Sequence, residues 1–556
     1  MYIMYNRNKF KHSLYLQITI VVLFFSNANA QSLSLEKDFL TDYLRNQQLI
    51  GANTDSNKIA NAYSFIIRPL ELNNAIAKLY TLKPTKKRLF LLPLVFNSTI
   101  NSHHPVGQNF GAMLPTSSPQ VYLSTGLYLT HKRWEFQFQP EIIYSANRSF
   151  ETFKHENYDP IWWSYYKWLN NIDKPEQFGV KPFLKIFPGQ SKIQYNFLKN
   201  YSVGISTQNL WWGPGIKNSL LMTNNAAGFL HLSLQTNKPV ITKWGAIEAQ
   251  MVFGKLDNSG IFPPDTNRVM NGSLLYIPKS DQWRYFTGYT FSYQPKWVSG
   301  LFLGAGVSTS IYHKNISGPG DLLPLTGIIV TNAEKQGLKA TYGSVFFRYL
   351  LKEANAEVYA EYGRNDRSAS IINLITDQNY SRGYVVGFRK ITKANRHNIR
   401  FEVTTEFTNL QATNAQEIYS ARSWYINSNV RHGYTQLGKV MGAGIGPGSK
   451  SQSIDFNILR RKTKIGVMLE RIDHNNDFYY NAYYPIRYWK KHWVDMGALY
   501  HAYFELNKQL FVKAQFGITR SLNYNWWEIP LVDPVLPGQG YDPINLHGNL
   551  TIVYHW

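Results

Sequence analysis

The amino-acid sequence predicts an all-β transmembrane protein: a large antiparallel outer-membrane β-barrel of about 18 strands, with a small N-terminal helical element at the periplasmic side. Three observations support this prediction. An export leader opens the chain, apolar and polar residues alternate with a period of two over most of its length, and the last strand ends on an aromatic residue. Aromatic side chains make up 15% of the 556 residues although the mean hydropathy is only −0.31, which is typical of strands with lipid on one side only.

Residues 1–30 have the pattern of a secretory signal peptide. Three basic residues precede an apolar run over 14–25, and Ala28 and Ala30 form a small-residue cleavage site, so we expect the mature chain to begin at Gln31. The apolar run is too short for a spanning helix, and no later stretch approaches the length that such a helix needs. An exported chain without a spanning helix is either soluble and periplasmic, or surface-bound, or a membrane barrel.

Residues 31–87 are predicted to form a helical element packed at the periplasmic mouth. Apolar residues recur at near-helical spacing over 33–50, and Gly51 is placed to end that helix. A second helical pattern covers 70–82 and is closed by the basic cluster 86–88. A flexible leader with nascent helix is the alternative.

Residues 88–556 are predicted to form the barrel with its long extracellular loops. Apolar and polar residues alternate in six well-spaced segments, 134–138, 247–253, 285–293, 358–362, 401–407 and 512–518. The polar members expected to face the lumen include Glu135, Glu248, Glu357, Glu402 and Lys513. At roughly 25 residues per strand and connection, the span holds about 18 strands.

The final strand carries an apolar face that ends in two aromatic residues. Leu550, Ile552, Tyr554 and Trp556 share that face, which suits lipid contact with an aromatic girdle at the interface. The segment is also similar to the carboxy-terminal signal that hands barrels to their insertion machinery. A soluble protein that ends in a half-buried strand is the alternative.

Polar stretches rich in Gly and Pro separate the strands. We expect the long ones to lie outside the cell, and their Tyr, Trp, Asn and Gln content suits contact with sugars, although the same residues also fill loops that only pack on each other. These stretches are 101–119, 145–190, 257–282, 313–336, 364–381, 411–455 and 523–546.

The charge balance favours anionic partners. The net charge is +23, which suits lipopolysaccharide phosphates or an acidic polysaccharide, with simple contact to anionic lipid as an equal alternative. Nucleic acid is not expected, because the surplus is spread along the chain without a recognition motif. The absence of Cys excludes disulfides, thiolate metal sites, Cys nucleophiles and a lipid-bearing Cys anchor.

No residue pattern predicts a catalytic site, a cofactor or a metal. Asp473, His474 and Asp477 have metal-compatible types close together, but they form a weak set. The glycines of 442–448 fit neither a dinucleotide-binding loop nor a phosphate loop. A serine nucleophile in a Gly-x-Ser-x-Gly turn is also missing, so a barrel hydrolase is the weakest of the functions considered.

The motif Trp-Trp-Gly-Pro-Gly at 211–215 places a bulky aromatic pair against a tightly specified turn. With its surroundings, from Pro188 to Phe229, it resembles the signature of the Wzi family of capsule-assembly proteins. Further similar blocks lie at 140–148, 358–366 and 431–452. The resemblance covers most of 100–455.

The resemblance implies an 18-stranded outer-membrane barrel with a small periplasmic-side helical bundle. Its function would be that of a non-enzymatic lectin that binds capsular or exopolysaccharide and helps to attach and organise it at the surface of a Gram-negative cell. Expected partners are this polysaccharide, outer-membrane lipids, lipopolysaccharide and the barrel-insertion machinery, and we expect a monomer. An outer-membrane porin or glycan-conducting channel is the alternative function.

Seven residues are candidates for contact with the polysaccharide. Two aromatic residues would offer a platform for sugar rings or form part of a plug, with a structural turn or girdle as the alternative. Five residues of a basic, Gly-rich stretch would meet carboxylates, with a solvated loop or lipopolysaccharide contact as the alternative. The candidates are Trp211 and Trp212, then Arg431, His432, Tyr434, Lys439 and Lys450.

Overall fold

The computed structural model describes most of the predicted barrel and part of the predicted helical element. The described residues are 37–51, 63–70, 84–86, 89–323, 337–365, 381–412, 423–483, 491–529 and 539–556. The predicted signal peptide at 1–30 and nearly all of the second helical pattern at 70–82 lie outside this set.

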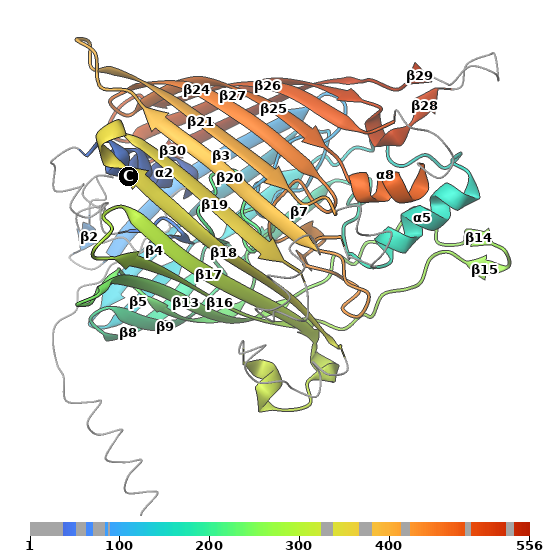
Figure 1. Ribbon diagram of the computed structural model, residues 1–556, viewed down its shortest axis with the longest axis horizontal. Coiled ribbons are helices and arrows are strands. Elements are labelled where there is room, and N and C mark those ends of the chain that lie inside the picture. Colours follow the sequence, from blue (N-terminus) through green and yellow to red (C-terminus); the bar gives the residue numbers. More distant parts are fainter. Residues whose placement is uncertain are drawn as a thin grey trace, which may run out of the picture.

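The described strands close into an antiparallel barrel of 18 strands, which confirms the predicted fold class (Figure 1). Three of the 18 are interrupted and carry two labels each. In chain order the wall consists of β3 (Leu89–Asn101), β4 (Gln120–His131), β5 with β6 (Trp134–Phe138, Glu141–Ser145), β7 with β8 (Phe183–Phe187, Lys192–Leu198), β9 (Tyr201–Ser206), β11 with β12 (His231–Thr236, Val240–Ile241), β13 (Gly245–Leu256), β16 (Arg284–Pro295), β17 (Leu301–Tyr312), β18 (Lys339–Leu351), β19 (Ala356–Arg364), β20 (Arg382–Ile391), β21 (Ile399–Asn409), β24 (Lys450–Arg460), β25 (Thr463–Asp473), β26 (Val494–Glu505), β27 (Leu510–Leu522) and β30 (Ile544–Tyr554).

The last strand closes the barrel. Strand β30 pairs with β27 on one edge and with β3 on the other, with Phe96 opposite Ile552. A short strand, β2 (Pro84–Lys86), pairs with the start of β3, so pairing to the wall begins within the range predicted to be helical. No sheet edge remains between the first and last long strands, as a barrel in lipid requires.

Alternation along the strands sorts side chains between the two faces of the wall. In β5, Trp134, Phe136 and Phe138 are 43%, 38% and 61% exposed, whereas Glu135 and Gln137 between them are buried. The outward residues form the lipid-facing surface and the inward ones face the barrel interior. The inward positions predicted for Glu248, Glu357 and Glu402 are likewise buried, and Lys513 lines the main cavity.

The two ends of the barrel differ as outer-membrane barrels do, with tight turns at one end and long loops at the other (Figure 1). The loop end carries α5 (Asp159–Leu169), α8 (Asn476–Ala482) and the hairpins β14–β15 (Val269–Met270, Ser273–Leu274) and β28–β29 (Glu528–Ile529, Gln539–Gly540). Short 3-10 helices occur at His313–Asn315, Pro319–Leu322, Lys352–Ala354 and Tyr524–Trp526. Three predicted loops are too long, because 145–190 contains β7, 411–455 contains the start of β24 and 523–546 contains the start of β30.

The predicted N-terminal helix is confirmed as α2 (Lys37–Ile50). It is followed by Gly51 with a φ of +65°, a left-handed conformation that suits the end of a helix. Figure 1 shows α2 at the end of the barrel where the chain terminates, which is the end with tight turns. Among the described helices, none has the length and apolarity that crossing a bilayer requires.

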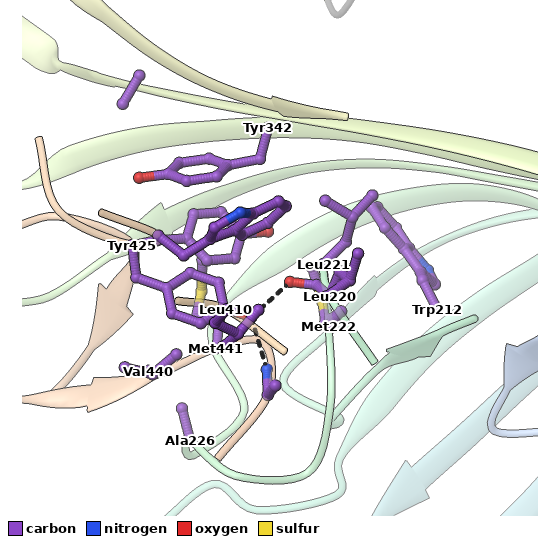
Figure 2. Packing of buried hydrophobic residues seen from close by; sticks show 14 of the residues in the cluster. Trp212, Leu220, Leu221, Met222, Ala226, Tyr342, Leu410, Tyr425, Val440 and Met441 are labelled. Atoms are coloured by element: carbon purple, nitrogen blue, oxygen red, sulfur yellow. Dashed lines mark hydrogen bonds between the residues drawn. The ribbon is translucent and has the colours of Figure 1, made fainter. Parts of the chain in front are cut away.

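Chain segments that we call the plug occupy part of the barrel interior: α2, residues 63–70, and two inward-folded segments, 207–230 and 423–449. Within the plug, β1 (Ile67–Arg68) pairs with β10 (Trp211–Trp212), and β22 (Thr435–Gln436) pairs with β23 (Lys439–Val440). A buried apolar cluster joins both inward-folded segments to inward-facing wall residues such as Phe286 and Tyr342 (Figure 2).

Candidate functional site

Helix α2 is held to the wall by a carboxylate shared between two guanidinium groups. Arg45 Nε donates to Glu357 Oε1 at 2.8 Å, and Arg348 Nε donates to Glu357 Oε2 at 2.6 Å. Arg348 also donates to Gln48 Oε1 of the helix at 2.7 Å. All four side chains are buried, and buried charges persist only when paired and hydrogen-bonded in this way.

A second ion-pair group lies one turn earlier on α2. Asp42 accepts from Arg389 at 2.6 Å and from Lys464 at 3.0 Å, and Lys464 also reaches Glu402 at 2.7 Å. Burial alone would raise the pKa of Asp42, but the Arg389 and Lys464 cations outweigh it and hold this pKa below its usual range. Asn46 completes the group by donating to Glu402 at 2.6 Å.

The Trp-Trp-Gly-Pro-Gly motif is a structural junction of the plug. Trp212 is completely buried, with its indole nitrogen donating to Gln250 at 2.7 Å. Arg68 lies over the Trp211 ring at 4.3 Å and donates to the carbonyl oxygens of Gly213 and Gly215 at 3.0 and 2.8 Å. The motif thereby ties segment 207–230 to residues 63–70.

Two wall carboxylates fix the turn that follows this motif. Glu406 accepts from the backbone N–H groups of Ile216 and Asn218, both at 2.7 Å. Glu361 accepts from the Leu220 N–H at 3.1 Å and from the Ser219 hydroxyl at 2.8 Å. The carboxylates that face the lumen therefore accept hydrogen bonds from the plug. The sequence predicted only that they face inward.

Segment 423–449 packs against the same turn. Figure 2 shows Tyr425 reaching Leu220, whose carbonyl accepts from the Tyr425 hydroxyl at 2.9 Å. Tyr434 donates to Ser308 of the wall at 2.8 Å and is completely buried. His432 Nδ1 lies 2.8 Å from the Tyr312 hydroxyl, and burial, with nearby cations, lowers the pKa of His432 to about 2.

Six of the seven predicted polysaccharide contacts are distributed through the plug, and Lys450 lies on the wall, so the seven do not share one exposed surface. Arg431 uses its guanidinium on the carbonyl oxygens of Asn170, Ile277 and Pro278, joining three parts of the loop end. Lys450 starts β24 opposite Asp473. The remaining aromatic and His candidates are buried, namely Trp211, Trp212, His432 and Tyr434. Their contact with sugar stays a prediction.

Lys439 anchors the segment 106–113 inside the barrel. Its Nζ donates to the carbonyl oxygens of Gly111 and Met113 at 2.8 and 2.9 Å. Burial lowers the pKa of Lys439 to about 7, because the ammonium group loses its water shell. Through these two hydrogen bonds Lys439 holds segment 106–113 against the plug.

The acidic and His residues considered for a metal take separate partners. Asp473 pairs with Arg471 at 2.6 Å, and His474 lies 2.8 Å from Asp495. Asp477 accepts from the Ser423 hydroxyl and from the backbone N–H of Ala412, and burial raises its pKa to about 6. No group of three His, Cys, Asp or Glu side chains suited to a metal occurs within the described residues.

At the loop end, α5 and α8 pack together through aromatic residues. Phe153 stacks on Tyr165 with ring centroids 4.1 Å apart and planes within 5°, and Phe478 of α8 meets both rings edge-on at 5.8 Å. Arg268 fixes the start of α5 through Asp159 and lies over the Trp162 ring at 4.8 Å. The loop end is therefore a packed layer with defined side-chain positions.

A cavity of about 560 Å³ lies beside the plug along the wall strands β3, β24–β27 and β30. Its lining includes amides, hydroxyls and imidazoles, for example Asn97, Thr519, Asn549 and His547, and one or more members of each ion-pair group of α2. The cavity is large enough to hold water, and these polar groups line part of it next to the helix.

Sequence reasoning missed two features that the structure brings together. The lumen carboxylates were predicted to face inward, but alternation cannot show that chain segments would meet them there. Helix α5 lay in a predicted loop, although its sequence alternates buried and exposed residues at helical spacing, with Trp163 and Lys167 exposed four residues apart.

Comparisons with known proteins agree with this architecture. The family model described as capsule assembly protein Wzi matches residues 196–535, more than half of the chain. The solved structure of Wzi from Escherichia coli, described as a carbohydrate-binding β-barrel involved in group 1 capsule assembly, aligns with a TM-score of 0.58 at 11% identity, covering 93% of this chain and 98% of that one.

Two other solved barrels are more distant. OccAB2 of Acinetobacter baumannii aligns with a TM-score of 0.41 at 11% identity, covering 84% of this chain and 97% of its own. OprB of Pseudomonas putida aligns with a TM-score of 0.36 at 9% identity, covering 86% and 96%. No curated protein matches the sequence. The barrel, its plug and the family match together show that this chain is an outer-membrane protein of the Wzi capsule-assembly family.

Proposed function

We propose that the protein is a non-enzymatic outer-membrane lectin that binds capsular or exopolysaccharide and helps to attach and organise it at the cell surface. The observation that carries the proposal is the combination of family membership with a barrel whose interior is occupied by its own chain. A barrel with a plug in its interior and a packed loop end suits holding a polymer better than conducting one.

The proposal includes the orientation and the partners of the protein. The loop end faces outward, since long loops do so in outer-membrane barrels. The apolar belt contacts lipid, the basic surplus of the chain favours lipopolysaccharide phosphates, and the terminal strand serves the insertion machinery. A monomer suffices, because the described wall closes within a single chain.

A channel for ions or glycans is the second candidate, and the cavity of about 560 Å³ beside the plug is the observation that favours it. Planar-bilayer recording separates the two functions. A lectin with a filled interior should pass little current, whereas steady open-channel steps of the native protein would favour the channel.

An enzymatic function has weaker support. Ser521 and His104 form a buried serine–histidine contact with 3.0 Å between Oγ and Nε2. The serine hydroxyl, however, donates to Asp495, and burial lowers the pKa of His104 to about 4. The arrangement suits a hydrogen-bonded support for the loop end better than an activated nucleophile.

Binding to the cell's own polymer tests the proposal. Purified protein in detergent micelles should retain surface polysaccharide extracted from the cells that produce it, and deletion of the gene should release polymer into the medium. Absence of retention, together with unchanged attachment in the deletion strain, would refute the lectin.

A further inference from the structure

Helix α5 presents an exposed aromatic and charged stripe at the loop end. Asp159, Trp163 and Lys167 follow one another at intervals of four residues, so they lie on successive turns of one face. Trp163 is 49% exposed, the Asp159 side chain is 52% exposed, and Lys167 lies over the Trp163 ring at 5.2 Å. The stripe extends over about 12 Å, which matches a short stretch of glycan.

The opposite face of α5 is firmly seated. Its buried residues are Ile161, Trp162, Ser164, Tyr165, Tyr166 and Leu169. Arg268 donates to Asp159 Oδ1 at 3.0 Å and to the carbonyl oxygens of His155 and Asn157, both at 3.1 Å. A rigid helix that leaves a tryptophan half exposed loses little conformational entropy when a ligand covers that ring.

We propose that the Asp159–Trp163–Lys167 stripe is a contact site for an anionic glycan, an inference that rests on the proposed lectin function. The indole of Trp163 covers the C–H face of a pyranose ring. Lys167, whose ammonium group lies over the other face of the ring, meets a sugar carboxylate, and Asp159 accepts from sugar hydroxyls. The charge surplus of the chain points the same way.

The chain contains a matched pair at the opposite end of the barrel. Lys243 lies over the ring of Trp244 at 5.0 Å, and Trp244 is 61% exposed in the tight turn before β13. The two pairs have the same chemistry and similar exposure, but only the α5 pair lies at the loop end. Substitutions at Trp244 and Lys243 therefore control for general effects of losing an exposed tryptophan or lysine.

The experiment compares four variants of the full-length protein in detergent micelles, namely W163A, K167Q, W244A and K243Q. The probes are oligosaccharide fragments of the surface polysaccharide of the producing cell, native or with their carboxylates chemically reduced to alcohols. Fragments are preferred because a long polymer would conceal a weakened site through avidity. Retention of heat-modifiable migration on gels confirms that each variant is folded.

We expect W163A to weaken binding of both probes about tenfold. K167Q should weaken binding of the native fragments about fivefold and leave the reduced fragments unaffected, while both control variants stay within about twofold of the native protein. Equal binding of native and reduced fragments by the unsubstituted protein would overturn the anionic assignment.

Two further outcomes separate this inference from the proposed function. If the unsubstituted protein binds the fragments and W163A and K167Q bind them equally well, the α5 site is refuted while the lectin stands. If the unsubstituted protein retains neither the fragments nor the intact polymer, the proposed function itself fails.

Discussion

At the scale of single residues, Glu357 joins the plug to the wall through one carboxylate. Its two oxygens accept from Arg45 and Arg348, and none of the three side chains is more than 2% exposed. Replacing one member of such a group leaves buried charge without compensation, which costs about 3 kcal/mol or more. The loss of stability should be largest for a substitution of Glu357, because both guanidinium groups donate to its carboxylate.

We expect Glu357→Gln to lower the free energy of unfolding by about 3 kcal/mol, measured by urea titration in detergent micelles. Glu353→Gln is the matched control, since Glu353 lies four residues away and is exposed. The same unfolding midpoint in both variants would contradict the anchoring role of Glu357.

His432 is expected to make the loop end sensitive to acid. Burial lowers the pKa of His432 from 6.5 to about 2, so the unfolded chain binds a proton between these values that the folded protein does not. Stability should therefore fall as the pH drops below 6.5, by about 2 kcal/mol at pH 5. The stability that neutral His432 contributes is fully present only at pH values above the pKa of this histidine in the unfolded chain.

The variant His432→Gln should reduce this pH dependence, because glutamine keeps a polar group near Tyr312 without titrating. Urea unfolding at pH 7 and pH 5 measures the difference, and His397→Gln at an exposed turn is the control. Comparing variant with native protein removes the opposite contribution of Asp477, whose pKa is raised to about 6. An unchanged pH dependence in His432→Gln would assign the acid response elsewhere.

At the scale of elements, the turn at 211–215 depends on a glycine. Gly213 has a φ of +129°, and a Cβ built there would lie 2.1 Å from Ser219 Oγ. Both the conformation and the space therefore exclude a side chain. The turn connects β10 to the backbone groups that Glu361 and Glu406 hold, so its distortion should propagate through the plug.

We expect Gly213→Ala to destabilise the protein by at least about 2 kcal/mol in urea unfolding. Gly260→Ala is the control that separates backbone strain from crowding. Gly260 also has a positive φ, of +70°, but no atom lies within 4 Å of the added carbon. Equal losses in the two variants would show that backbone strain alone, and not crowding inside the barrel, limits this turn.

Helix α2 should detach when its ion pairs are removed. In the double variant Asp42→Asn with Arg45→Met, the helix loses its charged contacts to Arg389, Lys464 and Glu357. Its amide hydrogens should exchange about 100-fold faster while those of the wall strands keep their protection. Uniform exchange throughout the protein would mean that the helix opens only with the barrel.

At the scale of the whole molecule, the sequence predicted the wall better than its contents. A period of two is a local property, so strands such as β5 and β13 could be located from alternation alone. The filling of the lumen depends on contacts between residues hundreds of positions apart, for which a single sequence has no local signal. The Trp-Trp-Gly-Pro-Gly motif was recognised as a specified turn, yet nothing in it showed that both indoles are buried in the interior.

The candidate site was predictable only in part for the same reason. Basic and aromatic composition singled out residues of 431–450 as sugar contacts, but polar residues in a Gly-rich stretch satisfy backbone carbonyls as readily as they bind ligands. Arg431 and Lys439 both donate to backbone carbonyl oxygens. The helical periodicity of 159–169, by contrast, is visible in the sequence and would have placed Trp163 and Lys167 on one face.

The partners of α2 have a consequence for the order of assembly. Arg45 and Glu357 are 312 positions apart in the sequence, and Asn46 and Glu402 are 356 apart. Since loop closure over such separations is slow, a helix near the N-terminus must wait for strands that arrive much later during translocation. We expect α2 to dock last, so pulsed hydrogen exchange during refolding should detect wall protection before helix protection.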